Sequence, residues 1–378
     1  MSRGEYRDAV IVGGGPAGST LARQLTAAGA RVTVIDKRRF PRDKTCAGWI
    51  TPAVLAALRL DPGEYQRSGR VLQPILGFGI ARMGEAPLCN HHGPHPASYA
   101  IRRCEFDHFL LERSGAELRT GSAVESLERN GKEWIVNGEL RTPLLVGAGG
   151  HFCPVARALG ADLGRGESIV GAQEFEVRMT PAQAQRCAVH ADTPQLYFCS
   201  DLTGYAWVVR KEDWLNVGIG RRDPRRLGEH FGRFLAAMVR DGVLDPELAR
   251  SHPHGHAYLL YPHAARPLVA DGALLVGDAA GLAYPESGEG IRPAVESALL
   301  AAAAVSACNG DYSSGALARY ARAVGGRFGS RAAAAVSPSL PGRAAQLTAA
   351  LLMHSRWFTR EILTRRWFLH EHVTPLQA

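Results

Sequence analysis

The sequence predicts an α/β fold in which a parallel-sheet domain is interrupted by a β-rich domain and followed by a helical segment. Three observations lead to this prediction. Residues 7–36 read as strand, glycine-rich turn, helix and strand, the pattern of a βαβ unit. A second buried strand of the same kind, residues 274–278, comes much later in the chain. Between them, residues 169–220 read as strands of a separate sheet.

The N-terminal βαβ unit has the residue types needed to hold a dinucleotide. An apolar strand, residues 9–12, leads into Gly-x-Gly-x-x-Gly at 13–18. The first glycine permits a tight turn, the second lets the backbone approach a pyrophosphate, and the third lets the helix pack close to the strand. The following helix points its positive N-terminal end at the phosphates. The residues assigned to this cradle are Gly13, Gly15, Pro16, Ala17 and Gly18.

The second strand of this unit, residues 31–35, delivers Asp36. The Asp36 carboxylate can accept hydrogen bonds from ribose hydroxyls and would repel a 2′-phosphate. The nucleotide is therefore predicted to be FAD or NAD, not NADP. Lys37, which follows, is assigned to the same cofactor site.

The later strand decides between the two nucleotides. It delivers Asp278, whose carboxylate can accept hydrogen bonds from a polyol chain. Gly288 and Gly290 then let the backbone approach a flat ring, and a helix begins there. The positive end of that helix would stabilise the anionic pyrimidine edge of a reduced flavin. NAD has neither a ribitol chain nor such a ring, so the pattern favours FAD.

The order of these elements predicts a discontinuous arrangement of domains. Asn130-Gly131 predicts a hairpin turn between strands at 124–129 and 133–136. The assigned ranges are 1–70, 97–165 and 265–330 for a Rossmann-type FAD-binding domain, 71–96 and 166–264 for a β-rich substrate domain, and 331–378 for a helical C-terminal segment.

Composition excludes several classes of protein. No run of 18 apolar residues is present, so no transmembrane helix is expected, and no signal peptide is expected because residues 1–8 lead directly into the first strand. The seven cysteines form no C-x-x-C pair and indicate reduced thiols, so a cytoplasmic location is expected. The net charge of +8 comes from scattered arginines, so nucleic acid is not an expected partner.

These motifs resemble the FAD-dependent oxidoreductases of the para-hydroxybenzoate hydroxylase fold, and most closely the geranylgeranyl reductase group. The resemblance rests on the two nucleotide elements and on the segments 40–48, 103–107 and 204–207. It implies that reduced flavin delivers a hydride to a carbon–carbon double bond of a small apolar substrate such as an isoprenoid. The electron donor would be NAD(P)H or a reductant protein, since no second glycine-rich nucleotide motif follows a strand.

The resemblance also implies roles for individual residues. Arg103 would contact the FAD phosphate or ribitol region, and Val124 would lie against adenine. Gly290 and Ile291 would meet the pyrimidine edge of the flavin, and Pro285 would lie near its reactive face. Gly48, in the segment 40–48, is assigned to the cofactor site as well.

Three residues are candidates for catalysis. Cys46 follows Lys44 in a loop expected to reach the flavin, where it would line the pocket or donate a proton, unless it is a small loop residue only. Tyr205 and Trp207 alternate on one strand face. They form either the substrate wall above the flavin, with Tyr205 as a second proton donor, or ordinary core packing.

Two histidine-containing segments and a basic, aromatic C-terminal segment each have a functional and a structural interpretation. The histidine-containing segments 89–95 and 252–256 have glycine and proline neighbours and no nearby acid, so no metal site is predicted. The C-terminal residues 356–369 are basic and aromatic. They either pack within the chain, cap the substrate pocket, pack on a partner subunit, or make peripheral contact with a membrane. The apolar arc of this segment consists of Trp357, Phe358, Ile362, Phe368 and Leu369.

Two alternative functions share these motifs. An FAD-dependent monooxygenase or halogenase, which uses oxygen and NAD(P)H, has the same fold and the same FAD motifs. The Trp-x-Trp-x-Ile-Pro motif of many halogenases is missing. A non-catalytic FAD-binding protein is the third reading, and the complete flavin edge at residues 288–291 argues against it.

Overall fold

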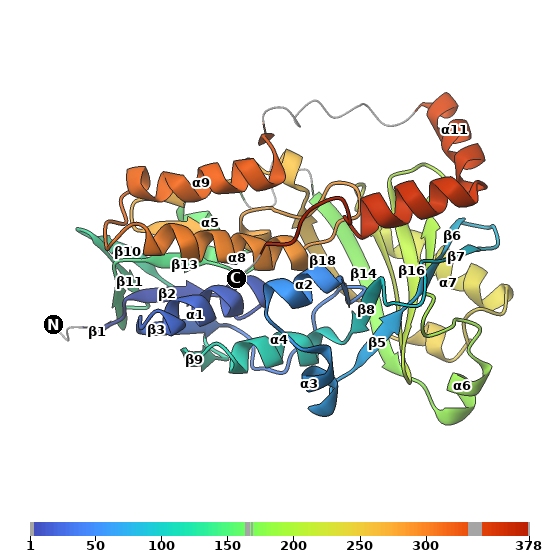
Figure 1. Cartoon of the computed structure of the whole chain (residues 1–378), viewed down its shortest axis with the longest axis horizontal. Helices are drawn as coiled ribbons and strands as arrows, with labels where there is room; N and C mark the ends of the chain where they lie inside the picture. Colours follow the sequence, from blue (N-terminus) through green and yellow to red (C-terminus); the bar gives the residue numbers. More distant parts are fainter. Residues whose placement is uncertain (1–3, 163–166, 168, 332–341, 377–378) are drawn as a thin grey trace.

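A computed structural model of the chain describes residues 4–331, apart from 163–166 and 168, and residues 342–376. Figure 1 shows an elongated molecule with a mostly parallel sheet toward one end and a large, mostly antiparallel sheet toward the other. The predicted α/β fold class is therefore confirmed. Part of the predicted C-terminal helical segment, residues 332–341, lies outside the described residues.

The parallel sheet forms because its central strands, at residues 9–12, 32–36, 145–147 and 273–275, are short, mostly apolar and buried. Helices α1 (Pro16–Ala27) and α8 (Ile291–Ser306) pack against each other beside it. The strand order is β19 (Val269–Ala270), β20 (Ala273–Leu275), β13 (Leu145–Gly147), β2 (Ala9–Val12), β3 (Val32–Asp36) and β9 (Glu117–Thr120). All pairs are parallel except that between β19 and β20.

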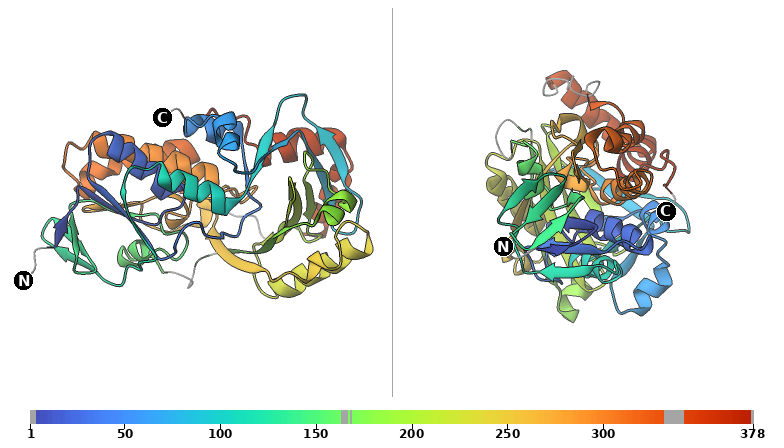
Figure 2. Two further views of the ribbon diagram at one scale, coloured as in Figure 1. Left: turned by 90° about the horizontal axis from the view of Figure 1, so that it is seen from below. Right: turned by 90° about the vertical axis from the view of Figure 1, so that its left-hand side faces the viewer.

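The seven-stranded sheet forms from strands whose side chains alternate between two faces. The outer face, which includes Phe175 and Val217, packs against α7 (Leu227–Arg240), and the inner face carries polar and aromatic residues. Figure 2 shows α7 on one side of this sheet and the C-terminal helical segment on the other. The strand order is β18 (His254–Leu259), β14 (Ile169–Arg178), β17 (Trp214–Arg221), β16 (Gly204–Lys211), β15 (Gln195–Phe198), β6 (Gly77–Arg82) and β7 (Leu88–His91).

Two smaller sheets complete the β structure. The first is β1 (Glu5–Tyr6), β12 (Leu140–Thr142), β11 (Glu133–Val136) and β10 (Leu127–Asn130), and the second is β4 (Trp49–Ile50), β8 (Ser98–Ile101) and β5 (Leu72–Ile75). The predicted Asn130-Gly131 hairpin is present between β10 and β11. Strand β10 begins three residues later than predicted, because the Asn137 side chain takes up the backbone N–H groups of Glu125 and Ser126.

The remaining helices connect and cover the sheets. They are α2 (Pro52–Ala57), α3 (Pro62–Arg67), α4 (Arg103–Glu112), α5 (Pro154–Ala158), α6 (Pro181–Arg186), α9 (Ser314–Phe328), α11 (Arg343–Met353) and the π-helical segment η4 (Phe358–Phe368). Short 3-10 turns include η1 (Leu248–Arg250), η2 (Tyr261–His263) and η3 (Gly277–Ala279). Within the part of the chain that the structure describes, no helix is both long and apolar enough to cross a bilayer.

Gly18→Ala tests the close packing of α1 on β2. A Cβ atom at Gly18 would lie 1.9 Å from the Gly13 carbonyl oxygen, which is backbone and cannot move aside easily. We expect the variant to lose roughly 1–3 kcal/mol of unfolding free energy and most of its bound FAD. Gly232→Ala in α7 meets open space and should instead gain about 0.5–1 kcal/mol. Urea unfolding and flavin absorbance measure both, and unchanged FAD retention in Gly18→Ala would contradict the predicted cradle.

Candidate active site

The N-terminus of α1 has the shape of a phosphate cradle. Gly13 adopts φ +116°, and a Cβ there would lie 2.3 Å from the Ala148 carbonyl oxygen, so only glycine fits the turn. Gly15 precedes α1, and only the Arg42 side chain comes within 4 Å of its Cβ position. Pro16 and Ala17 follow in the first turn of the helix. The backbone is therefore open to a ligand here, and the role of these residues in cofactor binding stays a prediction.

The structure also shows a cation that the sequence reasoning missed. The Arg42 guanidinium, which stacks 4.6 Å from the centre of the Phe40 ring, is the group next to Gly15. Its Nη1 lies 3.2 Å from the buried Asp107 carboxylate. Arg103 also binds Asp107, through two hydrogen bonds of 2.9 and 2.8 Å. Both arginines thus pair with Asp107, and Arg42 is the one whose guanidinium also lies beside the Gly15 turn.

The residues expected around the adenosine lie at the ends of β3 and β9. The Asp36 carboxylate accepts hydrogen bonds from the backbone N–H groups of Gly14 and Arg38, at 2.8 and 2.9 Å. Lys37 is exposed, and Val124 is partly buried against the core of the parallel sheet. A ribose would have to share the Asp36 carboxylate with the Gly14 turn.

Asp278 takes part in a charged cluster with Lys44 and His256. The Lys44 Nζ lies 2.5 Å from His256 Nε2, which lies 3.5 Å from Asp278 Oδ2. Desolvation lowers the pKa of Lys44 to about 8, and desolvation together with the Lys44 charge lowers that of His256 to about 4. Desolvation opposes ionisation of Asp278, but His256 and Lys44 bring its pKa down to about 2. Within the described residues, no group of three or more His, Cys, Asp or Glu could hold a metal ion.

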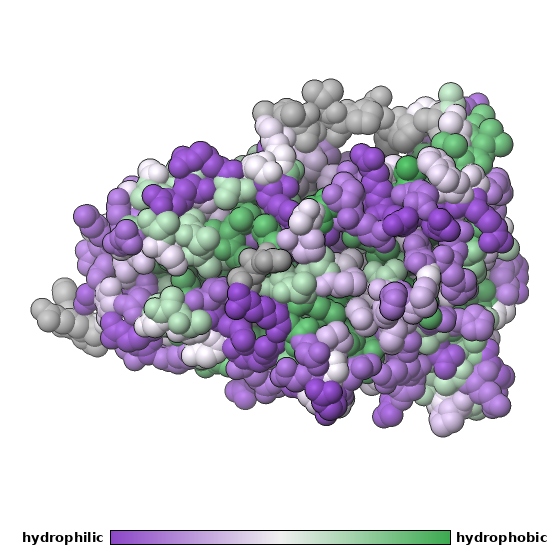
Figure 3. All heavy atoms as spheres, in the orientation of Figure 1, coloured by the Kyte–Doolittle hydropathy of each residue, from purple (hydrophilic) through white to green (hydrophobic). Residues whose placement is uncertain are grey.

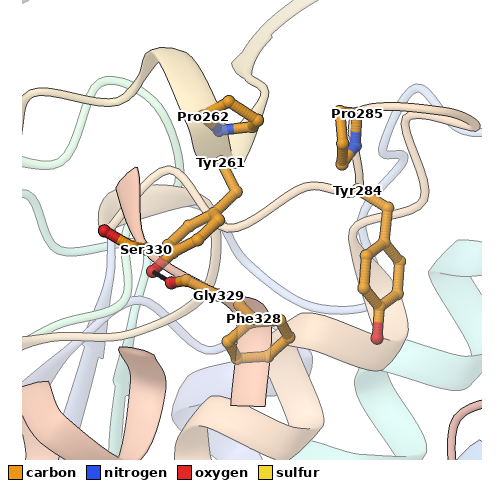
Figure 4. Close-up of a pocket in the computed structure, with 7 residues that line it drawn as sticks. All are labelled: Tyr261, Pro262, Tyr284, Pro285, Phe328, Gly329 and Ser330. Atoms are coloured by element: carbon orange, nitrogen blue, oxygen red, sulfur yellow. Dashed lines mark hydrogen bonds between the residues drawn. The ribbon is translucent and has the colours of Figure 1, made fainter. Parts of the chain in front are cut away.

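The predicted flavin edge adjoins this cluster. A Cβ on Gly290, the residue before α8, would lie 3.0 Å from Asp278 Oδ1, and Ile291 is buried in the first turn. Gly288 adopts φ +71° and lies against the Tyr258 hydroxyl. Pro285 is exposed and faces a hollow of about 280 Å³. Figure 4 shows the aromatic residues that line this hollow with Pro285, which are Tyr261, Tyr284 and Phe328.

Tyr205 and Trp207 lie on the same inner face of β16, with their ring centres 6.0 Å apart. The Tyr205 hydroxyl donates a 2.6 Å hydrogen bond to the Ser287 carbonyl, in the loop before α8. The Trp207 ring lies over Gly218, where a Cβ would come within 2.3 Å of it. The predicted substrate wall is therefore in contact with the predicted flavin edge.

Asn216 connects Trp207 to Cys46. Its Oδ1 accepts a 2.7 Å hydrogen bond from the Trp207 indole N–H, and its Nδ2 donates to the Cys46 carbonyl at 3.2 Å. Nδ2 also contacts the buried Glu174 carboxylate. The Cys46 Sγ itself accepts a 3.3 Å hydrogen bond from the Gly48 N–H. The structure thus brings the three catalytic candidates together on one side of the sheet.

Charged residues extend this network on the same inner face. The buried Lys211 Nζ donates a 2.6 Å hydrogen bond to Glu176, which also pairs with Arg102 at 3.1 Å. Gly48, at φ +67°, leaves room for the Lys211 ammonium, 2.6 Å from its Cβ position. Sequence reasoning missed Asn216, Glu174 and Lys211. The sequence pattern that could have identified them is a polar side chain at an inward-facing position of a strand whose outward-facing positions are apolar.

Comparison with known proteins identifies the family. A model of the FAD binding domain family matches residues 6–326. The chain belongs to this FAD-binding family. FAD is accordingly its cofactor, and the chain is an FAD-dependent oxidoreductase, as the two nucleotide elements predicted.

Curated relatives have reductase names. The chain is 29% identical to a menaquinone reductase of Mycobacterium tuberculosis, over 80% of this chain and 77% of that protein. It is also 29% identical to digeranylgeranylglycerophospholipid reductase 3 of Methanosphaera stadtmanae, over 86% of this chain and 84% of that protein. The predicted resemblance to the geranylgeranyl reductase group is confirmed.

Solved structures share the fold. A geranylgeranyl bacteriochlorophyll reductase-like protein of Thermoplasma acidophilum matches with a TM-score of 0.74 and 21% identity, over 97% of this chain and 99% of that one. The halogenase PltM matches with a TM-score of 0.68 and 17% identity, over 86% and 75% of the two chains. At these identities the likeness establishes the fold, which both kinds of enzyme share.

The pH dependence of stability tests the buried Glu174. Burial raises its pKa from 4.5 to about 7. Because the folded-state pKa lies above the unfolded one, stability from neutral Glu174 is complete below about pH 4.5 and is lost as the pH rises through about 7. Glutamine cannot ionise, so this loss is absent from Glu174→Gln. We therefore expect the unfolding free energy of Glu174→Gln minus that of the unmodified protein to increase as the pH is raised from 5 to 8, by at most about 3 kcal/mol. Urea unfolding at several pH values measures it.

Glu128→Gln is the matched control, because Glu128 is exposed on β10. Its stability should follow the unmodified protein at every pH. If stability depended on pH equally in Glu174→Gln and in the unmodified protein, the pKa of Glu174 would not be raised, and the prediction would be wrong.

Proposed function

We propose that this FAD-dependent oxidoreductase reduces a carbon–carbon double bond of an apolar, polyprenyl-type substrate. The observation that carries the proposal is the Tyr205–Ser287 hydrogen bond of 2.6 Å, which joins an aromatic wall to the loop expected at the flavin edge. An apolar chain held against this wall would lie next to the ring. The wall consists of Trp49, Phe78, Phe198, Tyr205, Trp207 and Tyr258, and it is covered by Phe358, Trp367 and Phe368 of the C-terminal segment.

The residues present fit FAD. The open backbone at Gly15 and the nearby Arg42 suit the pyrophosphate, and Asp36 suits the ribose. Asp278 suits the ribitol, and the N-terminus of α8 at Gly290 suits the pyrimidine edge of the ring. When bound, FAD supplies the hydride for the reduction.

The chain itself binds, orients and protonates the substrate. The aromatic wall excludes water and holds an apolar chain by burial of its surface. Burial raises the pKa of the Tyr205 hydroxyl well above 10, so this group keeps its proton at neutral pH. The Cys46 thiol, ordered by the Gly48 N–H, is the second proton donor on this face.

The names of curated relatives support a polyprenyl-type substrate and say nothing about the electron donor to the flavin. Names of curated relatives include digeranylgeranylglycerophospholipid reductase and, in rice, geranylgeranyl diphosphate reductase. Geranylgeranyl groups are polyprenyl chains, which suit an apolar aromatic wall. NAD(P)H docked transiently, or a reductant protein, would reduce the flavin.

An anaerobic turnover experiment tests the proposal. The FAD-loaded protein is reduced with NADH, NADPH or dithionite and mixed with geranylgeranyl diphosphate or a digeranylgeranyl glycerophospholipid. We expect the flavin to reoxidise only when substrate is present, and mass spectrometry to show the gain of one hydrogen molecule per reduced double bond. If the substrate is unchanged anaerobically, and an oxygen atom, or a halogen atom when halide is present, is added to it only after air is admitted, the proposal is contradicted and a monooxygenase or halogenase is favoured.

Variants of the proton donors separate catalysis from packing. Tyr205→Phe or Cys46→Ala should lower kcat by roughly 10²-fold or more if that residue supplies the proton, with FAD content unchanged. Tyr312→Phe, in the nucleotide-binding part of the chain, is the control and should leave kcat unchanged. If both donor variants keep full kcat, water supplies the proton and these roles are wrong.

A further inference from the structure

The predicted apolar arc of the C-terminal segment is only partly buried: Phe368 and Leu369 are buried, and Phe358 and Ile362 are half-buried. Phe368 and Leu369, with the neighbouring Leu363, pack into the same cluster as Trp207 on the inner side of the seven-stranded sheet. The Phe368 ring centre lies 5.1 Å from that of Tyr205. The end of this segment therefore packs within the chain and covers the predicted substrate wall. Trp357, at the start of the arc, is 66% exposed.

A different apolar surface is exposed just before this packed region. Helix α11 is held to the body near its C-terminal end, where Met353 is buried. Figure 1 and the right-hand view of Figure 2 show the helix standing off from the body, and Figure 3 shows hydrophobic side chains gathered on it. We call this the α11 surface, which consists of Leu347, Leu351, Leu352 and Trp357, exposed by 67%, 76%, 42% and 66%.

The α11 surface is unusual for this molecule. Four of the seven exposed large hydrophobic residues among the described residues lie within this one stretch. The other three, Tyr6, Phe152 and Leu118, lie in the first 152 residues and do not form one stretch of chain. Contiguous exposed apolar surface marks a site of interaction, whereas scattered residues do not.

Within residues 343–360, which contain the α11 surface, the charged side chains are all arginines. Residues 343–360 contain Arg343, Arg356 and Arg360 and no Asp or Glu, and all three arginines are exposed. Of these three arginines, Arg360 pairs with the adjacent Glu361 at 2.7 Å. A helix with exposed leucines, one tryptophan and flanking arginines matches the chemistry of an anionic bilayer surface.

We propose that the α11 surface docks on an anionic lipid bilayer. The leucines and Trp357 would enter the boundary between headgroups and acyl chains, and Arg343 and Arg356 would lie among the lipid phosphates. The chain continues directly from Trp357 into η4, whose Phe368 touches Tyr205. Docking here would place η4, which covers the substrate wall, at the membrane surface, where long apolar chains reside.

Vesicle flotation of the full-length, FAD-loaded protein tests the proposal. The vesicles contain phosphatidylcholine alone or phosphatidylcholine with phosphatidylglycerol. We expect binding to the anionic vesicles that weakens with salt, and a double variant, Leu351→Glu with Trp357→Glu, that binds roughly tenfold or more weakly. Arg343→Glu with Arg356→Glu should lower binding to anionic vesicles and leave the weak binding to neutral vesicles unchanged.

Leu118→Glu is the matched control, because Leu118 is 41% exposed on β9, far along the chain from α11. It should bind vesicles like the unmodified protein. Equal vesicle binding by the α11 variants and the control would overturn the proposal. So would self-association, measured by analytical ultracentrifugation, that the α11 variants abolish, because a second copy of the chain would then cover this surface.

This docking does not rest on the proposed reaction. FAD content and flavin reduction are read in the same samples. A protein that binds vesicles but reduces no double bond would contradict the proposed function and leave the docking proposal intact. An active enzyme that does not bind vesicles would contradict the docking proposal and leave the proposed function intact.

Discussion

The Asn216 side chain makes the contacts on which the rest of the candidate site depends. One amide accepts a hydrogen bond from the Trp207 indole and donates one to the Cys46 carbonyl. Asn216 is almost fully buried in the middle of the seven-stranded sheet, where an unpaired amide would cost about 1–3 kcal/mol. The amide therefore fixes the cysteine loop, the aromatic wall and the sheet relative to one another.

The inner face of the sheet is built around this contact. Gly218 leaves the space that the Trp207 ring fills, and Tyr205 then reaches the Ser287 carbonyl before α8. Because α8 begins beside Asp278, the same chain of contacts links the substrate wall to the cluster of Lys44 and His256. The residues proposed to meet an apolar substrate thus contact the loop before α8, with polar groups where the flavin is expected.

The parts of the fold and site that could be predicted are those that depend on residues close together in the sequence. The βαβ unit and the hairpin at residues 130–131 were correct because glycines, apolar runs and turn residues act locally. The role of Asn216 could not be predicted, since it depends on the pairing of β14, β16 and β17. The burial of Phe368 likewise depends on tertiary contacts, with Tyr205 and Phe198. The domain boundaries and the roles of the site residues stay predictions.

Hydrogen–deuterium exchange at residues 44–50 in an Asn216→Leu variant tests this account most directly. Leucine has the same branched shape and number of heavy atoms but removes the hydrogen bonds to Trp207, Cys46 and Glu174. The account predicts that amide exchange in the cysteine loop becomes about tenfold faster or more, while exchange in α1 stays unchanged. Unchanged protection of the loop would contradict the account, because the loop would then be held by contacts other than Asn216.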